Sequence, residues 1–210
     1  MKSITWILLG FGLLTWTAPC RAESNTNNAH SCCCAATPPA STNALTDQSL
    51  YQIDATWTND SGRAMKLSSL RGQPQIVLMF FASCPYACPL LVHQVKQIEA
   101  ALPETLRNRV GFTLVTFDSE RDTPQVLKAY REQHDLAASR WTLLHGDADA
   151  VLDLAALLGV RFKKDANGQF SHSNVITLLN ADGEIAFQQA GLNSDAQEMV
   201  RHIEKLINTP

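Results

Sequence analysis

The sequence lacks the features that mark several specialised classes of protein. Its ten glycines and nine prolines, 19 of 210 residues, are too few for a fibrous or wholly disordered chain. Charged residues make up 18% of the chain and the formal net charge is −3, so no nucleic-acid partner is expected. The length and the 45% hydrophobic content instead fit one globular domain, or at most two small ones.

Cysteine is absent from residues 89–210, and this absence shapes the rest of the interpretation. The six cysteines are Cys20, the run Cys32-Cys33-Cys34, and the pair Cys84 and Cys88. A fold held together by disulfides would have bridges spread along the chain. The distribution therefore indicates cysteines that perform chemistry rather than cysteines that hold the fold together.

Residues 1–22 are predicted to be a signal peptide. Lys2 is followed by an apolar run over residues 4–17, shorter than the ~18–20 residues that cross a bilayer. Cys20-Arg21-Ala22 offers a cleavage site with small residues at its ends. Two alternatives remain open, an uncleaved anchor and a lipoprotein modified at Cys20. We expect a mature protein in the periplasm or another extracytoplasmic compartment, with membrane anchoring the less favoured outcome.

Residues 23–47 are predicted to be a flexible linker, because they contain almost no large apolar residue to bury. Within this segment lies a short tract that contains His30, Cys32, Cys33 and Cys34. Such a tract is a candidate metal-binding arm. The alternative is an incidental cluster of thiols with no ligand.

Residues 48–210 are predicted to form one α/β domain with a mixed central sheet flanked by helices. A continuous apolar run at 75–81 suits a central strand buried on both faces, and two cysteines follow it at once. A strand followed directly by cysteines at a helix start is typical of a thioredoxin-like fold. The other expected elements are a hairpin at 53–67, strands at 110–117 and 141–145, helices from 124 and at 148–158, a hairpin at 174–190 and a helix from a Ser194 cap to about 207.

Three residues separate Cys84 from Cys88, so on one helix the two sulfur atoms would share a face. At a helix start the positive end of the dipole would lower both thiol pKa values and favour the thiolate, which is the nucleophilic and metal-binding form. The alternatives are a structural disulfide or two buried thiols. Most redox enzymes of this fold have two intervening residues, and the wider gap suits two sulfur atoms that bind one ion.

His172 is the predicted third ligand among six histidines. It lies in the loop that enters the strand at 175–179. In thioredoxin-like folds this loop packs against the cysteines and normally carries a cis-proline. No proline lies between Pro124 and Pro210, which argues against an ordinary dithiol oxidoreductase. Two thiolates and one imidazole favour copper, as Cu(I) or Cu(II), while structural zinc would need a fourth ligand.

The chain resembles the Sco/SenC family of copper-binding, thioredoxin-like assembly factors of cytochrome c oxidase. The resemblance rests on Phe81-Ala-Ser-Cys84-Pro-Tyr-Ala-Cys88-Pro89, on Phe117-Asp118-Ser-Glu-Arg-Asp122-Thr-Pro124 and on His172-Ser ahead of Leu178-Leu-Asn-Ala-Asp-Gly183. It implies that Cys84, Cys88 and His172 bind copper and that Asp118 lies near the site, at the end of its strand beside the metal loop. The alternative role for Asp118 is that of a cap on the approach to the next helix or a partner of Arg121.

Two functions follow as hypotheses. The first is an extracytoplasmic copper chaperone that delivers copper to an apo-protein, such as the copper subunit of cytochrome c oxidase. This chaperone would also have a second copper chaperone or a thiol reductant as a partner. The second is a thiol–disulfide oxidoreductase in which Cys84 and Cys88 are catalytic and keep the client's cysteines reduced. A peroxiredoxin-like peroxidase is disfavoured, because Phe81-Ala82-Ser83 precedes Cys84 where a Thr-x-x-Cys arrangement would be needed.

Overall fold

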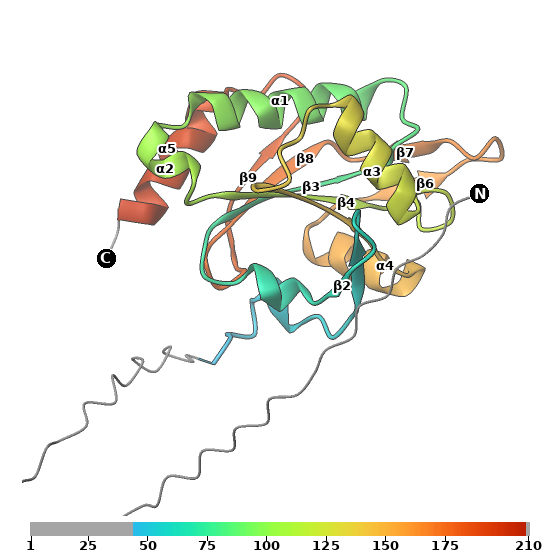
Figure 1. Ribbon diagram of the computed structural model, residues 1–210, viewed down its shortest axis with the longest axis horizontal. Helices are drawn as coiled ribbons and strands as arrows, with labels where there is room; N and C mark the ends of the chain where they lie inside the picture. Colours follow the sequence, from blue (N-terminus) through green and yellow to red (C-terminus); the bar gives the residue numbers. More distant parts are fainter. Residues whose placement is uncertain (1–43, 209–210) are drawn as a thin grey trace, which may run out of the picture. The chain divides into compact units, whose positions relative to one another are not determined.

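A mixed seven-stranded sheet forms the centre of the computed structural model, which describes residues 44–208 (Figure 1). Its strands are β1 (Trp57–Asn59), β2 (Ala64–Met65), β3 (Gln75–Phe80), β4 (Gly111–Thr116), β5 (Trp141–His145), β8 (Val175–Leu179) and β9 (Ile185–Ala190). They lie in the order β2-β1-β5-β4-β3-β8-β9. The three central strands β5, β4 and β3 are parallel, and the remaining pairs are antiparallel. The predicted α/β class with a mixed sheet is confirmed.

Helices cover both faces of this sheet. Figure 1 shows α1, α3 and α5 over one face and α4 over the other. A separate two-stranded hairpin is formed by β6 and β7. The helices and the hairpin strands outside the central sheet are η1 (Leu50–Gln52), η2 (Leu67–Leu70), α1 (Ala87–Ala101), α2 (Glu104–Arg107), α3 (Pro124–Gln133), α4 (Ala148–Leu157), β6 (Phe162–Lys164), β7 (Phe170–His172) and α5 (Ala196–Asn208), of which η1 and η2 are short 3-10 helices.

The apolar run predicted to be a central strand is β3. All six of its residues are buried, with β4 on one side and β8 on the other. A strand buried on both faces has no polar face to present to water, which explains its continuous rather than alternating hydrophobic pattern. This strand brings the chain from the centre of the sheet directly to the two cysteines.

The predicted helix caps are correct for α3 and α4. The Thr123 hydroxyl accepts the backbone N–H of Val126, and Pro124 is the first helical residue. In α4 the Asp147 carboxylate accepts the N–H of Ala150 at 2.8 Å. Gly159 follows the helix with φ +67°, a left-handed conformation that favours glycine.

Two predicted boundaries are wrong. At the start of α5 it is Asp195 that accepts the N–H of Gln197, at 2.9 Å, while the Ser194 hydroxyl donates backwards to the carbonyl of Ala190. A carboxylate was available one residue later and took the capping position. The first strand begins at Trp57 rather than residue 53, and residues 53–56 belong to no helix or strand.

The predicted signal peptide (residues 1–22) and most of the predicted linker (residues 23–47) lie outside the described residues, as do Cys20, His30, Cys32, Cys33 and Cys34. The domain start predicted at residue 48 stays a prediction. Between residues 44 and 208, no helix combines the length and the apolar character that crossing a membrane requires.

Candidate metal centre

The structure brings Cys84, Cys88 and His172 together. One potential ligand atom from each residue lies within 4.8 Å of the other two. Cys84 lies in the loop after β3, Cys88 is the second residue of α1, and His172 is the last residue of β7. Both cysteines are free thiols in the structure. The three residues that were selected from the sequence as candidate ligands therefore converge from separate parts of the fold.

The loop after β3 presents the first sulfur atom. Its turn is closed by the N–H of Cys84, which donates to the carbonyl of Phe81 at 3.2 Å. The N–H of Cys88 donates to the Sγ of Cys84 at 3.3 Å. N–H groups in the first turn of a helix have no partner inside the helix, so this sulfur takes the place of a capping side chain. Cys84 is thereby held at the start of α1.

The predicted helical pairing of the two cysteines is wrong in its geometry. Cys84 precedes α1, which begins at Ala87, so the pair does not occupy one helix face. Pro85 lies before the helix, and only Pro89 lies in its first turn. The sulfur atoms nevertheless meet, because the turn after β3 directs Cys84 back toward the helix start.

The predicted lowering of the thiol pKa is also wrong for Cys88. Burial raises the pKa of this thiol above its ordinary value, and the neighbouring Cys84 and Asp122 raise it further, while the backbone N–H of Phe81 acts in the opposite direction. Cys88 is 0% exposed and packs within the hydrophobic core. Removal from water disfavours the charged thiolate more than the helix dipole favours it.

His172 has both ring nitrogens in contact with protein atoms. Its Nδ1 lies 3.0 Å from the carbonyl oxygen of Ser173 and its Nε2 lies 3.5 Å from the Sγ of Cys88. A carbonyl oxygen only accepts hydrogen bonds, so Nδ1 carries the proton and donates it. The Nε2 lone pair then faces the Cys88 sulfur, which is the orientation that metal-binding histidines adopt when the other nitrogen is fixed by a carbonyl.

The hairpin that carries His172 was missed in the sequence, which predicted a loop at this position. In β6 and β7, Phe162 pairs with His172 and Lys164 pairs with Phe170. The His172 ring packs beside the ring of Phe117, with 5.2 Å between centroids. An aromatic cluster therefore supports the imidazole. The signal for it in the sequence is the set of three phenylalanines at positions 117, 162 and 170, which lie too far apart in the chain to form a local pattern.

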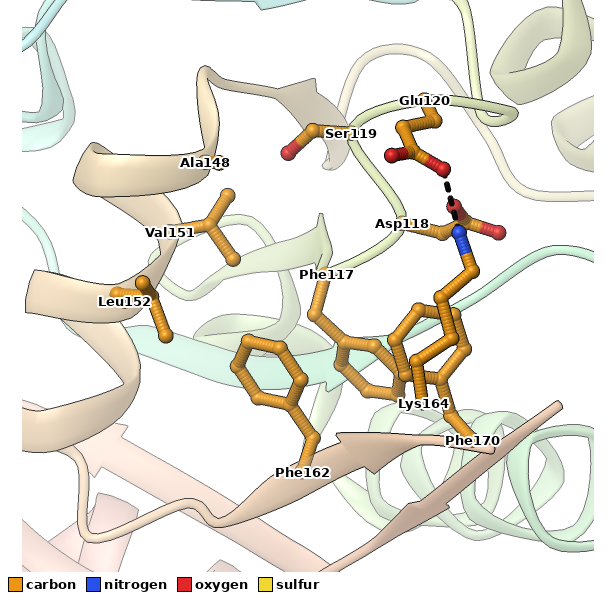
Figure 2. A pocket seen from close by; sticks show the side chains of 10 residues that line it. All are labelled: Phe117, Asp118, Ser119, Glu120, Ala148, Val151, Leu152, Phe162, Lys164 and Phe170. Atoms are coloured by element: carbon orange, nitrogen blue, oxygen red, sulfur yellow. Dashed lines mark hydrogen bonds and ion pairs between the residues drawn. The ribbon is translucent and has the colours of Figure 1, made fainter. Parts of the chain in front are cut away.

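A cavity of about 240 Å³ is lined in part by the phenylalanines of this aromatic cluster. Figure 2 shows phenylalanine rings from β6, β7 and the end of β4 facing the side chains of α4 across it. The polar residues of the cavity wall lie in the loop after β4, apart from Lys164. Its lining residues are Phe117, Asp118, Ser119, Glu120, Ala148, Val151, Leu152, Phe162, Lys164 and Phe170.

Asp118 lies outside the group of three converging ligands. Its side chain is 1% exposed and forms an ion pair with Arg121. One carboxylate oxygen, Oδ1, is buried and has no hydrogen-bond partner among the described residues. Of the roles that the sequence left open for Asp118, the structure shows the pairing with Arg121.

Two thiols and one imidazole form a soft donor set. Thiolate sulfur selects Cu(I) and imidazole nitrogen suits Cu(I), Cu(II) and Zn²⁺. Cys84 is only half-buried, so one side of the group is accessible to a second molecule. Such a set can hold a metal ion with an open position, and its two thiols can also form a disulfide with each other.

Known proteins of one family resemble this chain over most of its length. The family model for SCO1/SenC matches residues 43–208. The SCO1 protein homolog of Bacillus subtilis (strain 168) is 22% identical over 150 residues, 69% of this chain and 76% of that protein.

Solved structures share the fold. The copper-bound ScoI of Bradyrhizobium japonicum superposes with a TM-score of 0.62 at 23% identity, covering 72% of this chain and 96% of that chain. A second match is to BsSco, which is described as a member of the Sco family of cytochrome c oxidase assembly proteins and in which a disulfide switch was identified. Its structure has a TM-score of 0.65 at 20% identity and covers 79% of this chain and 99% of that chain. The thioredoxin-like architecture predicted from the sequence is thus shared with these proteins.

Proposed function

This chain belongs to the SCO1/SenC family, and we propose that it is an extracytoplasmic copper chaperone. It binds copper through Cys84, Cys88 and His172 and delivers the ion to an apo-copper protein. The client is a copper subunit of cytochrome c oxidase, in keeping with the assembly role stated for BsSco. The predicted signal peptide would place the protein in the compartment where such a client receives its metal.

The convergence of the three ligand atoms within 4.8 Å carries this proposal. His172 lies far from the two cysteines in the chain, and the three residues come from a loop, a helix and a hairpin. A structural disulfide would need only the two cysteines, so the imidazole directed at Cys88 is the feature that favours a metal ion. Binding displaces the thiol protons, since only the thiolate is a metal ligand.

The exposure of the site suits transfer rather than permanent storage. Cys88 is fully buried and His172 is packed against Phe117, whereas Cys84 is half-buried. Beside it Tyr86 is 80% exposed, which leaves an aromatic side chain available for contact with a partner. A client's ligands would approach from the Cys84 side and replace the three donors one at a time.

A thiol–disulfide oxidoreductase is the second candidate, and the free, adjacent cysteines favour it. The Cys84 thiolate would attack a client disulfide and release one client thiolate. The Cys88 thiolate would then attack the Cys84 sulfur of the mixed disulfide. The products are a Cys84–Cys88 disulfide and a client with two thiols, so two electrons pass from this protein to the client.

Titration with copper separates the two candidates. The reduced protein is titrated with Cu(I) and Cu(II), and absorption is followed for thiolate-to-copper charge transfer. The chaperone proposal predicts about one copper at this site and a loss of affinity in His172→Ala. The oxidoreductase predicts reduction of a client disulfide at a rate that is unchanged in His172→Ala. Full copper affinity in that variant would overturn the three-ligand site.

A further inference from the structure

The loop between β4 and α3 contacts both segments that carry the candidate ligands. We call residues 118–122 the bridge loop. Figure 2 shows Glu120 of this loop in an ion pair with Lys164 of β6, above the aromatic cluster. The Arg121 guanidinium also reaches the hairpin, where its Nη2 donates to the carbonyl of Gly168 at 2.6 Å. Two adjacent side chains thus hold the hairpin that ends at His172.

Arg121 is itself anchored in the protein interior. Its Nε donates to the buried carboxylate of Asp118, and the Asp118 N–H donates to the hydroxyl of Thr116 at 3.0 Å. Arg121 remains 39% exposed, so the guanidinium extends from a fixed carboxylate toward the surface hairpin. The planar guanidinium presents several donors in a rigid arrangement, which lets one side chain join Asp118 to Gly168.

The same guanidinium also contacts Phe170, which lies on the same face of β7 as His172. Two cations lie over the Phe170 ring. The Cζ of Arg121 is 5.8 Å and the Nζ of Lys164 is 5.7 Å from the ring centroid. Residues two apart on a strand point to the same side, so Phe170 and His172 share a face. Phe170 also packs on Phe81, with 5.2 Å between ring centroids. A shift of Phe170 would therefore move His172.

The other end of the bridge loop holds the cysteine loop. The Asp122 carboxylate accepts the N–H of Ala82 at 2.8 Å and the hydroxyl of Thr116. Ala82 lies two residues before Cys84. The bridge loop therefore joins the segment with the two sulfur atoms to the segment with the imidazole, although these are far apart in the chain.

We infer that Arg121 is a positioning residue that holds the β6–β7 hairpin so that the His172 imidazole meets Cys84 and Cys88. This inference rests on the proposed copper site and names a residue that acts through another. Without the guanidinium, the two thiols keep their places, while Gly168 and Phe170 of the hairpin lose the side chain that ties them to Asp118. The site then loses its nitrogen donor and retains its two sulfur donors.

The test compares Arg121→Gln with Arg131→Gln. Arg131 is a matched control, because it also pairs with a carboxylate, that of Asp60, and donates to two backbone carbonyls, those of Leu136 and Trp141. The Arg131 side chain is more buried than that of Arg121, so its loss should cost at least as much stability. None of the Arg131 contacts involves the hairpin or the cysteine loop.

Copper affinity is the first readout. We expect Arg121→Gln to weaken Cu(II) binding ~10–100-fold, the range for loss of groups that support a metal ligand, while Cu(I) affinity changes less. The coupling of an imidazole nitrogen to Cu(II) in pulsed electron paramagnetic resonance should disappear. Arg131→Gln should retain both properties. In a His172→Ala background, Arg121→Gln should have no further effect on the ratio of Cu(II) to Cu(I) affinity.

Amide hydrogen exchange of the apo-protein is the second readout and needs no metal. We expect faster exchange in the β6–β7 hairpin of Arg121→Gln than in that of Arg131→Gln. Unchanged hairpin exchange, or wild-type Cu(II) binding in Arg121→Gln beside a loss in His172→Ala, would overturn the inference. Full Cu(II) binding in His172→Ala would instead overturn the proposed copper site, and the exchange result would still decide whether Arg121 holds the hairpin.

Discussion

The Nε2 atom of His172 lies 3.5 Å from the Sγ atom of Cys88, although the two residues are 84 positions apart in the chain. Because Nδ1 donates to the carbonyl of Ser173, the imidazole faces the thiol with its lone pair. In the apo-protein the Cys88 S–H is the donor in this contact. When that proton leaves, the lone pair and the thiolate are both directed at the same position.

In a chain whose Cys32, Cys33 and Cys34 are serine, replacement of either Cys84 or Cys88 by serine should abolish copper binding, but the two variants should differ in stability. Cys84→Ser changes a half-buried residue and should alter the free energy of unfolding by less than about 0.5 kcal/mol. Cys88→Ser places a hydroxyl at a fully buried position and should cost about 1–3 kcal/mol. Denaturant unfolding and copper titration of both variants check this. Retained copper binding in Cys84→Ser would contradict the proposed ligand set.

Copper affinity should rise with pH. Burial raises the pKa of the Cys88 thiol, so at neutral pH this ligand is protonated and must release its proton on binding. The apparent binding constant should gain about tenfold per pH unit for each proton released. Calorimetric titration in buffers of different ionisation enthalpy counts these protons. A binding constant that does not change between pH 6 and 8 would argue against Cys88 as a ligand.

The same raised pKa has a consequence for the apo-protein. A thiol that is harder to ionise when folded stabilises the fold fully below its ordinary pKa, and this contribution is lost as the pH rises toward the folded value. The stability of the apo-protein should therefore fall above about pH 9. Chemical unfolding as a function of pH measures this slope. Cys88→Ser serves as the control, since its slope should be shallower.

Oxidation of the cysteine pair should block copper binding reversibly. A Cys84–Cys88 disulfide has no thiolate to offer, so treatment with a thiol oxidant should remove the copper site and dithiothreitol should restore it. Equilibrium dialysis before and after each treatment provides the measurement. If the oxidised pair held copper as tightly as the reduced pair, the role of the thiols as ligands would be refuted.

Gly183 should tolerate a side chain less well than Gly159. Both have positive φ, +85° and +67°, but a Cβ at Gly183 would lie 2.6 Å from the ring of Tyr51, whereas a Cβ at Gly159 meets nothing within 4 Å. Both Gly→Ala variants incur backbone strain, and the steric overlap adds roughly 1–3 kcal/mol at Gly183 alone. Thermal unfolding of the two variants isolates this difference, and equal losses would disprove the overlap with Tyr51.

The parts of the fold that were predictable from the sequence are those governed by local signals. The buried strand β3 has a continuous apolar run, and α3 and α4 begin with side chains that cap them. The candidate ligands could be selected because sulfur and imidazole side chains are few in residues 48–210 and adjoin recognisable elements. These signals act over a few residues and need no knowledge of distant contacts.

The parts that were not predictable depend on contacts between distant segments. The strands β6 and β7 have three residues each, too few for a clear alternating pattern, and they are held by Phe117 and the bridge loop. The raised pKa of Cys88 follows from burial in the assembled core rather than from its place near a helix start. The position of Cys84 ahead of α1 depends on how the turn after β3 closes.

The most direct test of the proposed site is the copper stoichiometry of the reduced full-length chain in which Cys32, Cys33 and Cys34 are replaced by serine. This variant retains Cys84, Cys88 and His172 and removes the thiols of the predicted metal-binding arm. We predict one copper per chain with a thiolate-to-copper charge-transfer band, and markedly weaker Cu(II) binding when His172→Ala is added. Unchanged Cu(II) affinity and an unchanged spectrum in the His172→Ala protein would contradict the three-ligand copper site.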